Sequence, residues 1–327
     1  MMKFSRLLSS LFCIALLTLT TLAEAQPDRL TGKPFATRSE VIGENGMVAT
    51  SQPLAVQVGL QILKNGGNAI DAAIATNATL GVMEPTGNGI GGDLFAIIWS
   101  EEDQQLYGLN ASGRSPQELS YGELQKELEN QGRESIPPYG VLPISVPGTV
   151  DGWFQMHDKL GSMPMDQILQ PAINYANKGF PVSELIAYYW DIGARIHSDR
   201  PGAFREEMTI DGRGPEKGEI MKRPALANTL SILADQGRDA FYEGQIADKI
   251  DEFMRENGGY LRKEDFEDHT STWVDPVSVN YRGYDVYELP PNGQGIAALQ
   301  MLQILEEYDL ASMGYGSEEA LHYLGGS

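Results

Sequence analysis

The stretch that decides the fold contains three blocks: Gly46-Met47-Val48-Ala49-Thr50-Ser51-Gln52-Pro53, Gly66-Gly67-Asn68-Ala69-Ile70-Asp71-Ala72-Ala73 and Glu84-Pro85-Thr86-Gly87-Asn88-Gly89-Ile90-Gly91-Gly92-Asp93. Pro53 predicts a helix start, because the missing proline N–H has no intrahelical partner in the first turn. That helix ends at Gly66-Gly67, since glycine adopts the left-handed conformation that closes a helix. Asn68 with Asp71 forms a capping-box-like start for the next helix. The two helices are therefore expected to be neighbours joined by a tight turn.

The second helix, Ala69 to about Leu80, is rich in alanine, so its backbone can approach another layer closely and we expect it to be buried. Leu94 to Trp99 and Gln105 to Leu109 then flank a polar turn, which is typical of a β-hairpin. The loop that follows this hairpin is expected to lie at one end of a sheet. It reads Asn110-Ala111-Ser112-Gly113-Arg114-Ser115-Pro116.

In this order, the blocks resemble the large subunit of the gamma-glutamyltransferase family, within the N-terminal nucleophile hydrolases. The resemblance extends from about Gly43 to Leu310. It includes Val146-Pro147-Gly148-Thr149-Val150-Asp151-Gly152-Trp153, Gly179-Phe180-Pro181-Val182, Ala240-Phe241-Tyr242-Glu243-Gly244, Trp273-Val274-Asp275-Pro276, Tyr281-Arg282-Gly283-Tyr284 and Leu289-Pro290-Pro291-Asn292-Gly293-Gln294-Gly295. The resemblance implies an α+β fold, a four-layer α-β-β-α sandwich that is incomplete without the small subunit.

Members of this family use an N-terminal threonine, freed when a precursor cleaves itself, whose hydroxyl attacks an amide carbon and whose α-amine serves as the base. That threonine opens a small subunit beyond the matching region. The resemblance thus implies that residues 26–327 are a large-subunit portion truncated before the catalytic small subunit, with no catalytic residue of its own. A truncated gene or a fragment is the simplest explanation. The implied activity of the completed enzyme is hydrolysis and transpeptidation of glutathione or another gamma-glutamyl amide, with no cofactor, and the chain alone is expected to be inactive.

Arg114 is the residue for which the resemblance implies a substrate role. Family members that transfer glutamyl groups hold the substrate α-carboxylate with an arginine in this loop, and a guanidinium suits bidentate carboxylate binding. That arginine falls four residues before the proline, where this chain has Ser112, whereas Arg114 is two residues before Pro116. The implied substrate-binding residues are therefore Arg114, Ser112 and Asn110.

The form of this loop is closer to the gamma-glutamyltransferase-like branch and to cephalosporin-acylase-like relatives. Two alternatives stay open for the chain, namely an acylase for another carboxylated amide and a non-catalytic scaffold. Arg114 itself has a structural alternative, in which it braces its own loop against a carboxylate.

The N-terminus predicts a secretory signal peptide over residues 1–25. Lys3 and Arg6 precede the apolar stretch Leu7 to Leu22, and Ala23-Glu24-Ala25 is a small-x-small cleavage site before Gln26. A membrane anchor is the alternative, but serine and threonine interrupt the stretch and leave it shorter than the roughly 20 apolar residues of a span. We expect a periplasmic or secreted protein.

The composition excludes several classes of site. Cys13 is the only cysteine and lies in the predicted leader, where a lipid anchor stays open, so residues 26–327 have no disulfide and no cysteine nucleophile or metal ligand. The formal net charge is −21, and because the leader contributes +1, residues 26–327 carry −22. Such an acidic surface disfavours binding to nucleic acid and to anionic membranes. Its simplest interpretation is solvation or adaptation to a salty environment.

The glycine-rich segment Gly87 to Gly92 is not a dinucleotide-binding fingerprint. That fingerprint follows a strand and opens a helix, whereas this segment follows a predicted helix and opens a predicted strand. Its glycines let a buried loop pass under neighbouring layers or form a backbone-lined pocket wall. Asp151 has no evident partner for acid or base work, and neither a metal-ligand pattern among the histidines nor a Gly-x-Ser-x-Gly elbow is present.

The rest of the chain predicts further helices and one late hairpin within a single domain over residues 26–327. The segment 116–135 has the charge pattern of a helix, a helix carries Trp153, and further helices are expected at 165–178 and 184–196. A helix–turn–helix follows at 224–257 with its turn at Gly237, then a hairpin at 277–287 and a last helix at 296–310.

Overall fold

The computed structural model describes residues 40–326. The chain divides after Met47 into two units, and the helices and strands of the described residues belong to the second unit, Val48–Ser327. The predicted leader, residues 1–25, lies outside the described residues, and the prediction of a single domain over 26–327 stays a prediction.

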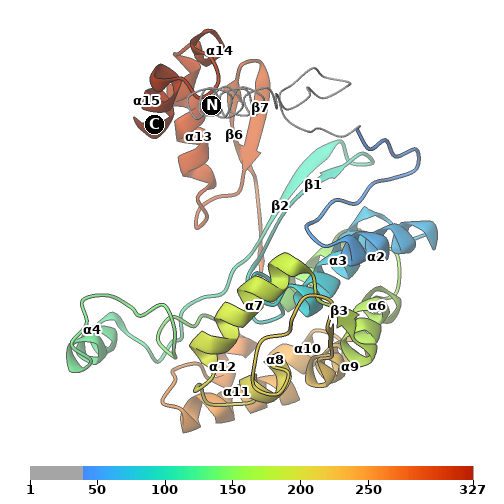
Figure 1. Cartoon of the computed structure of the whole chain (residues 1–327), viewed down its shortest axis with the longest axis vertical. Coiled ribbons are helices and arrows are strands. Elements are labelled where there is room, and N and C mark those ends of the chain that lie inside the picture. Colours follow the sequence, from blue (N-terminus) through green and yellow to red (C-terminus); the bar gives the residue numbers. More distant parts are fainter. Residues whose placement is uncertain (1–39, 327) are drawn as a thin grey trace, which may run out of the picture. The chain divides into compact units, whose positions relative to one another are not determined.

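Helices α2 (Pro53–Lys64) and α3 (Ala69–Met83) form the predicted pair (Figure 1). The predicted capping box is present, because the Asn68 side chain accepts from the amide of Asp71 while the Asp71 carboxylate accepts from the amide of Asn68 at 2.8 Å. The helices pack so closely that a Cβ at Gly59 would lie 2.4 Å from the hydroxyl of Thr76. Helix α3 is buried as expected and runs to Met83, beyond the predicted end at Leu80.

The hairpin that follows is also confirmed and is the centre of the largest sheet. Strands β1 (Leu94–Ser100) and β2 (Gln105–Ala111) pair antiparallel, and β2 pairs antiparallel with β5 (Thr272–Val274). Helix α5 (Thr149–Leu160) packs against β1 and β2 on one face. Since side chains alternate across a strand, Phe95, Ile97 and Trp99 of β1 point to the other face, where they are 46%, 42% and 55% exposed.

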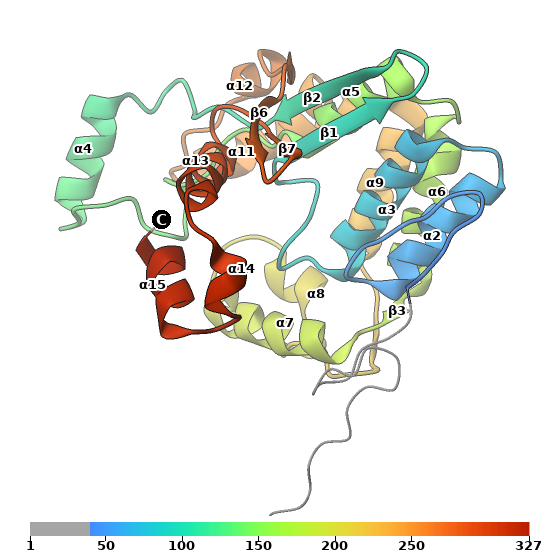
Figure 2. The ribbon, with the colours of Figure 1, turned by 90° about the horizontal axis from the view of Figure 1, so that it is seen from above.

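Helices build most of the core. Helix α6 (Met165–Lys178) packs against both α3 and α9 (Pro224–Gln236), and these helices lie side by side in both views (Figures 1 and 2). The largest fully buried side chains are Trp153, Trp190, Tyr242, Phe180 and Phe266.

The remaining elements are short. The strands are β3 (Phe180–Pro181), β4 (Ile220–Met221), β6 (Val277–Tyr281) and β7 (Tyr284–Glu288), and the helices are α4 (Tyr121–Asn130), α7 (Glu184–His197), α8 (Phe204–Met208), α10 (Asp239–Tyr242), α11 (Gln245–Glu256), α12 (Lys263–Glu267), α13 (Gly295–Glu306), α14 (Leu310–Met313) and α15 (Glu318–Gly326). Pairs β3–β4 and β6–β7 are antiparallel, and α13 packs on the β6–β7 hairpin. With these elements, the described chain is a mixed α+β structure.

Among the described residues, every helix is too short or too polar to cross a bilayer.

Two boundaries differ from the predictions for local reasons. The helix-like segment 116–135 contains only α4, because Ser120 caps its start by accepting from the amide of Glu123. The predicted last helix, 296–310, ends at Glu306, and the side chain of Asp309 then caps α14 by accepting from the amide of Ser312.

Candidate functional site

The loop that carries Arg114 leaves the end of β2 and is fixed through its backbone. The amide of Gly113 donates to Oδ1 of Asp93 at 3.0 Å, and the amide of Val146 donates to the carbonyl of Arg114 at 3.0 Å. A Cβ at Gly113 would lie 1.5 Å from the carbonyl oxygen of Val146, so only glycine fits there. The position of the Arg114 backbone is therefore set by its neighbours.

The Arg114 side chain, in contrast, is exposed and makes no hydrogen bond or ion pair with any residue in the range 40–326. In the structural alternative, Arg114 braces its own loop by pairing with a carboxylate. No carboxylate among residues 40–326 forms such a pair with Arg114. Arg114 therefore presents an unpaired guanidinium on a rigid loop.

Asn110 and Ser112 lie beside this cation in a closed hydrogen-bonded cluster with Asn292. Nδ2 of Asn110 donates to Oδ1 of Asn292 at 2.7 Å, and Nδ2 of Asn292 donates to the Ser112 hydroxyl. The Ser112 hydroxyl donates in turn to Oδ1 of Asn110 at 2.8 Å. Sequence reasoning missed Asn292, although it lies in the Leu289–Gly295 block that carried the resemblance. The cluster joins the Arg114 loop to a segment 180 residues away in sequence.

The buried carboxylate of Asp151 belongs to a hydrogen-bonded network that reaches the segment next to this loop. Asp151 is fully buried and accepts from the Ser271 amide at 2.6 Å, from the Ser271 hydroxyl and from Nε of Arg238. The Tyr242 hydroxyl accepts from the Asp151 amide at 3.0 Å and donates to the carbonyl of Pro147 at 2.8 Å. Because Pro147 follows the residue that holds Arg114, this network links the core to the loop. No local sequence pattern predicts these partners. The Asp151 carboxylate therefore has a structural role, which is to hold Arg238 and Ser271 together in the core.

His269 packs against the same network. It is buried, it stacks on the ring of Tyr242 with 5.2 Å between centroids, and its Nε2 has no hydrogen-bond partner among the described residues. Burial lowers the pKa of His269, with Arg238 and Arg114 acting in the same direction and Asp151 opposing them. The His269 ring therefore packs on Tyr242 as part of the buried network. Within residues 40–326 no group of three or more His, Cys, Asp or Glu side chains could hold a metal ion.

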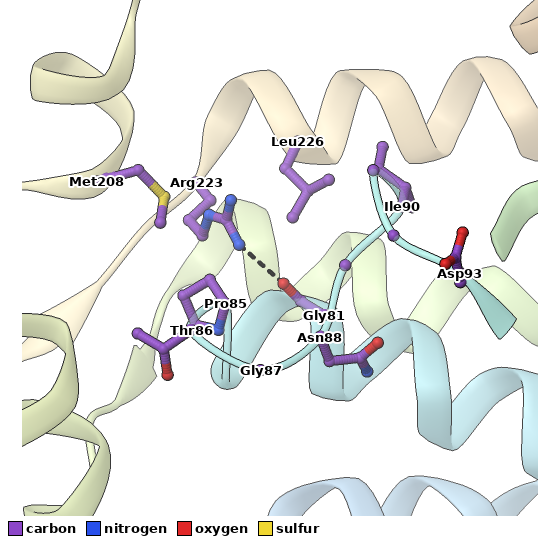
Figure 3. A pocket seen from close by; sticks show the side chains of 13 residues that line it. Gly81, Pro85, Thr86, Gly87, Asn88, Ile90, Asp93, Met208, Arg223 and Leu226 are labelled. Atoms are coloured by element: carbon purple, nitrogen blue, oxygen red, sulfur yellow. Dashed lines mark hydrogen bonds between the residues drawn. The ribbon is translucent and has the colours of Figure 1, made fainter. Parts of the chain in front are cut away.

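The glycine-rich segment lines a pocket of about 490 Å³ on the other side of Asp93 (Figure 3). As predicted, this segment follows a helix, α3, and opens a strand, β1. It is partly exposed and forms the pocket wall, so the structure favours the second of the two interpretations of its glycines. Arg223 lies in the same pocket and donates through Nη1 to the carbonyl of Gly81 at 2.8 Å. Burial lowers the pKa of Arg223 to about 10.

Comparison with known proteins agrees with the resemblance. Residues 55–326 match the family described as Gamma-glutamyltranspeptidase. The Glutathione hydrolase-like YwrD proenzyme of Bacillus subtilis (strain 168) is 38% identical over 285 residues, which cover 87% of this chain and 53% of that protein.

Two solved structures have a similar fold. The cephalosporin acylase from Bacillus halodurans has a TM-score of 0.80 and 42% identity, with 89% of this chain and 54% of that chain covered. The Helicobacter pylori gamma-glutamyltranspeptidase has a TM-score of 0.81 and 30% identity, with 88% and 82% covered.

This chain spans about half the length of the curated relatives it matches. The family match covers most of the chain, and the similar structures share its fold of N-terminal nucleophile hydrolase type. The chain therefore belongs to the gamma-glutamyltranspeptidase family.

Proposed function

We propose that this chain is the large-subunit portion of a gamma-glutamyl amide hydrolase and acyltransferase, made as a self-cleaving precursor. The nucleophilic threonine then lies in a segment outside these 327 residues and acts on glutathione or a related gamma-glutamyl amide. The glutathione hydrolase-like proenzyme of B. subtilis and the H. pylori gamma-glutamyltranspeptidase support this proposal by their names.

The observation that carries the proposal is the unpaired guanidinium of Arg114 on a loop whose backbone is fixed. A cation held without a protein counter-ion suits an anionic substrate group, and a guanidinium binds a carboxylate through two parallel hydrogen bonds. Ser112 and Asn110 are already bonded to Asn292 and to each other. Their proposed part in substrate binding is therefore to hold the loop and present polar edges beside Arg114.

The proposed partner is the small subunit, and the open face of β1 supports it. Phe95, Ile97 and Trp99 form an apolar stripe that no described residue covers well. A second sheet laid on this stripe would complete the four-layer α-β-β-α sandwich, because the two inner faces of packed sheets are apolar. The predicted leader over residues 1–25 supports a periplasmic or secreted location for the assembled enzyme.

An acylase for another carboxylated amide is the second candidate. The 42% identity to the B. halodurans cephalosporin acylase favours it, together with the position of Arg114 two residues rather than four before Pro116. Both candidates need a carboxylate-binding cation. They differ in whether the substrate also carries an α-amine.

The test uses the complete gene product and the Arg114→Ala variant on a carboxylate substrate and on its methyl ester. We expect Arg114→Ala to lower kcat/KM for the free carboxylate about ten- to a hundredfold, the worth of one charge-assisted contact. Turnover of the ester should change little, and self-cleavage should persist because it involves no bound carboxylate. Arg133→Ala, at another exposed arginine, is the matched control.

A gamma-glutamyl anilide and a glutaryl anilide separate the two candidates, because the glutaryl compound keeps a carboxylate but lacks the α-amine. Faster turnover of the gamma-glutamyl compound supports the first candidate and the reverse supports the acylase. An equal loss on acid and ester in Arg114→Ala contradicts the carboxylate-binding role.

A further inference from the structure

Another pocket, of about 640 Å³, is lined by residues of helices α7 and α8. The two helices lie side by side in both views (Figures 1 and 2). The wall is completed by Pro85 and Thr86, which follow α3, and by Tyr139 from the segment between α4 and α5. The volume lies within the roughly 300–1,000 Å³ of small-molecule sites. No residue of the Arg114 loop lines this pocket, so it is separate from the proposed donor site.

Aromatic side chains form much of the wall. Tyr139 and Phe204 both contact the ring of His197 edge to face, with 4.9 and 5.4 Å between centroids. Tyr189 adds a ring from α7. Tyr139 and Tyr189 are still 46% and 49% exposed, so much of their apolar area is not yet removed from water. Because aromatic rings pair favourably with other rings, the wall suits a planar aromatic ligand.

The core holds this wall in place. Trp190, the residue after Tyr189, is fully buried and lies 6.4 Å from Phe180 between ring centroids. Its Nε1 donates to the carbonyl of Met208, the last residue of α8, at 2.7 Å. This bond joins α7 to α8 across the pocket floor. The pocket is therefore formed before any ligand arrives.

The charge of the pocket selects for an anion. Arg200 lines it, whereas no Asp or Glu does. The Arg200 guanidinium lies over the Tyr139 ring, 5.9 Å from its centroid, and makes no ion pair or hydrogen bond with any side chain in the range 40–326. The ring nitrogens of His197 have no hydrogen-bond partner in that range either. In a chain with 45 acidic and 24 basic residues, an arginine without a carboxylate partner in an aromatic pocket attracts an anion and repels a cation.

From these features we propose that the pocket binds an aromatic carboxylate, a planar ring system with one carboxylate on a short linker. The ring packs against Tyr139, Tyr189 and Phe204, and the carboxylate pairs with Arg200. A guanidinium can bind a carboxylate through two parallel hydrogen bonds. This site is additional to the Arg114 loop and does not depend on the proposed function.

Binding to the complete gene product tests the site, with 2-naphthylacetate as the probe. Its primary amide lacks the charge, and decahydro-2-naphthylacetate keeps the charge but lacks the planar ring system. By equilibrium dialysis we expect 2-naphthylacetate to bind about tenfold more tightly than the amide, the worth of one charge-assisted contact. We expect it to bind about threefold or more tightly than the saturated acid, the worth of an aromatic pair.

The first variant removes the cation. Arg200 is exposed, so Arg200→Gln should leave the fold intact, raise the Kd for 2-naphthylacetate about tenfold and abolish the preference over the amide. Arg133→Gln, at an exposed arginine outside the pocket, is the matched control and should bind as the wild type does. Arg114→Ala should also bind as the wild type does, because Arg114 belongs to the other site.

The second pair of variants tests the aromatic wall. Tyr188 and Tyr189 are neighbours on α7 that contact each other edge to face, but only Tyr189 lines the pocket. Tyr189→Ala and Tyr188→Ala therefore lose the same ring contact, and the difference between them reports the pocket. We expect Tyr189→Ala to raise the Kd about threefold or more above that of Tyr188→Ala.

The outcomes decide between this pocket and other sites. Absent saturable binding, equal binding of acid and amide, or an unchanged Kd in Arg200→Gln overturns the proposal. A Kd that rises in Arg114→Ala and not in Arg200→Gln places the anion at the donor loop and also overturns it. Equal Kd values for Tyr188→Ala and Tyr189→Ala contradict the aromatic wall. Turnover of gamma-glutamyl anilides is measured separately, and its absence would count against the proposed function alone.

Discussion

At the scale of single residues, the buried carboxylate of Asp151 is the centre of the hydrogen-bonded network next to the Arg114 loop. Its ion pair with Arg238 is desolvated, since Asp151 is fully buried and Arg238 is 22% exposed. Removing one member of such a pair leaves an uncompensated buried charge, which costs about 3–5 kcal/mol.

Asp151→Ala should therefore lower the free energy of unfolding by about that much, measured by chemical denaturation. Asp158→Ala, at an exposed aspartate, is the control and should change stability little. In the double variant Asp151→Ala with Arg238→Met the loss should be smaller than the sum of the two single losses, and strict additivity would contradict the pairing.

The buried His269 makes stability depend on pH. Its folded-state pKa lies below the ordinary value of 6.5, chiefly through burial, with Arg238, Arg114 and the opposing carboxylates of Asp151 and Asp93 as its charged neighbours. Below pH 6.5 the unfolded chain therefore binds the proton first. This contribution to stability is complete above pH 6.5 and decreases as the pH falls toward the folded-state pKa.

We expect wild type to lose stability between pH 7.5 and 5.5, and His269→Phe, which keeps the ring stacked on Tyr242, to lose less over the same interval. Denaturation curves at both pH values measure the difference. An identical pH dependence in the two proteins would rule His269 out as its source.

At the scale of elements, the α2–α3 turn is tied to the end of α5 through Asp71. The Asp71 carboxylate accepts from the Ser162 amide at 3.0 Å and hydroxyl at 2.6 Å, and from the Met163 amide at 3.2 Å, in addition to capping α3. Burial acts to raise the pKa of Asp71, but these hydrogen bonds together with that from Asn68 outweigh it and lower the pKa.

Asp71→Ala should cost about 1–3 kcal/mol, because it leaves the buried Met163 amide and two partly buried amides unpaired as well as removing a cap. Asp166→Ala, in the exposed first turn of α6, is the comparison and should cost less than 1 kcal/mol, roughly the worth of an exposed charge near a helix start. Equal thermal melting points for the two variants would contradict the role of Asp71 as a joint between elements.

At the scale of the whole molecule, the apolar stripe of β1 controls the behaviour of the chain without a partner. Exposed apolar sheet faces and strand edges promote aggregation. We therefore expect the 327-residue chain alone to be inactive toward gamma-glutamyl anilides and to aggregate.

Ile97→Lys should make the isolated chain more soluble and should block assembly of the complete gene product, as measured by light scattering and by the yield of processed enzyme. Tyr121→Lys removes an exposed aromatic residue from α4 and is the control for general solubility. A soluble, monomeric and active wild-type chain would contradict this account.

The sequence alone determined the parts of the structure that depend on near neighbours. Pro53, the Gly66-Gly67 pair and the Asn68–Asp71 cap act within a few residues, so the helix pair and its turn followed from local chemistry. The β1–β2 hairpin followed for the same reason, since its turn and its pairing are adjacent in the chain. Arg114 was singled out through the family resemblance, and its loop directly follows that hairpin.

Only the tertiary structure decided which polar groups meet. Asp151 bonds Arg238 and Ser271 across 87 and 120 residues, and Arg223 bonds Gly81 across 142. No local pattern encodes such pairs, because each forms only after the packing of several helices has closed a long loop and excluded water. The open space beside Gly89 is likewise a property of the packed chain, since it is defined by what the surrounding elements leave unfilled.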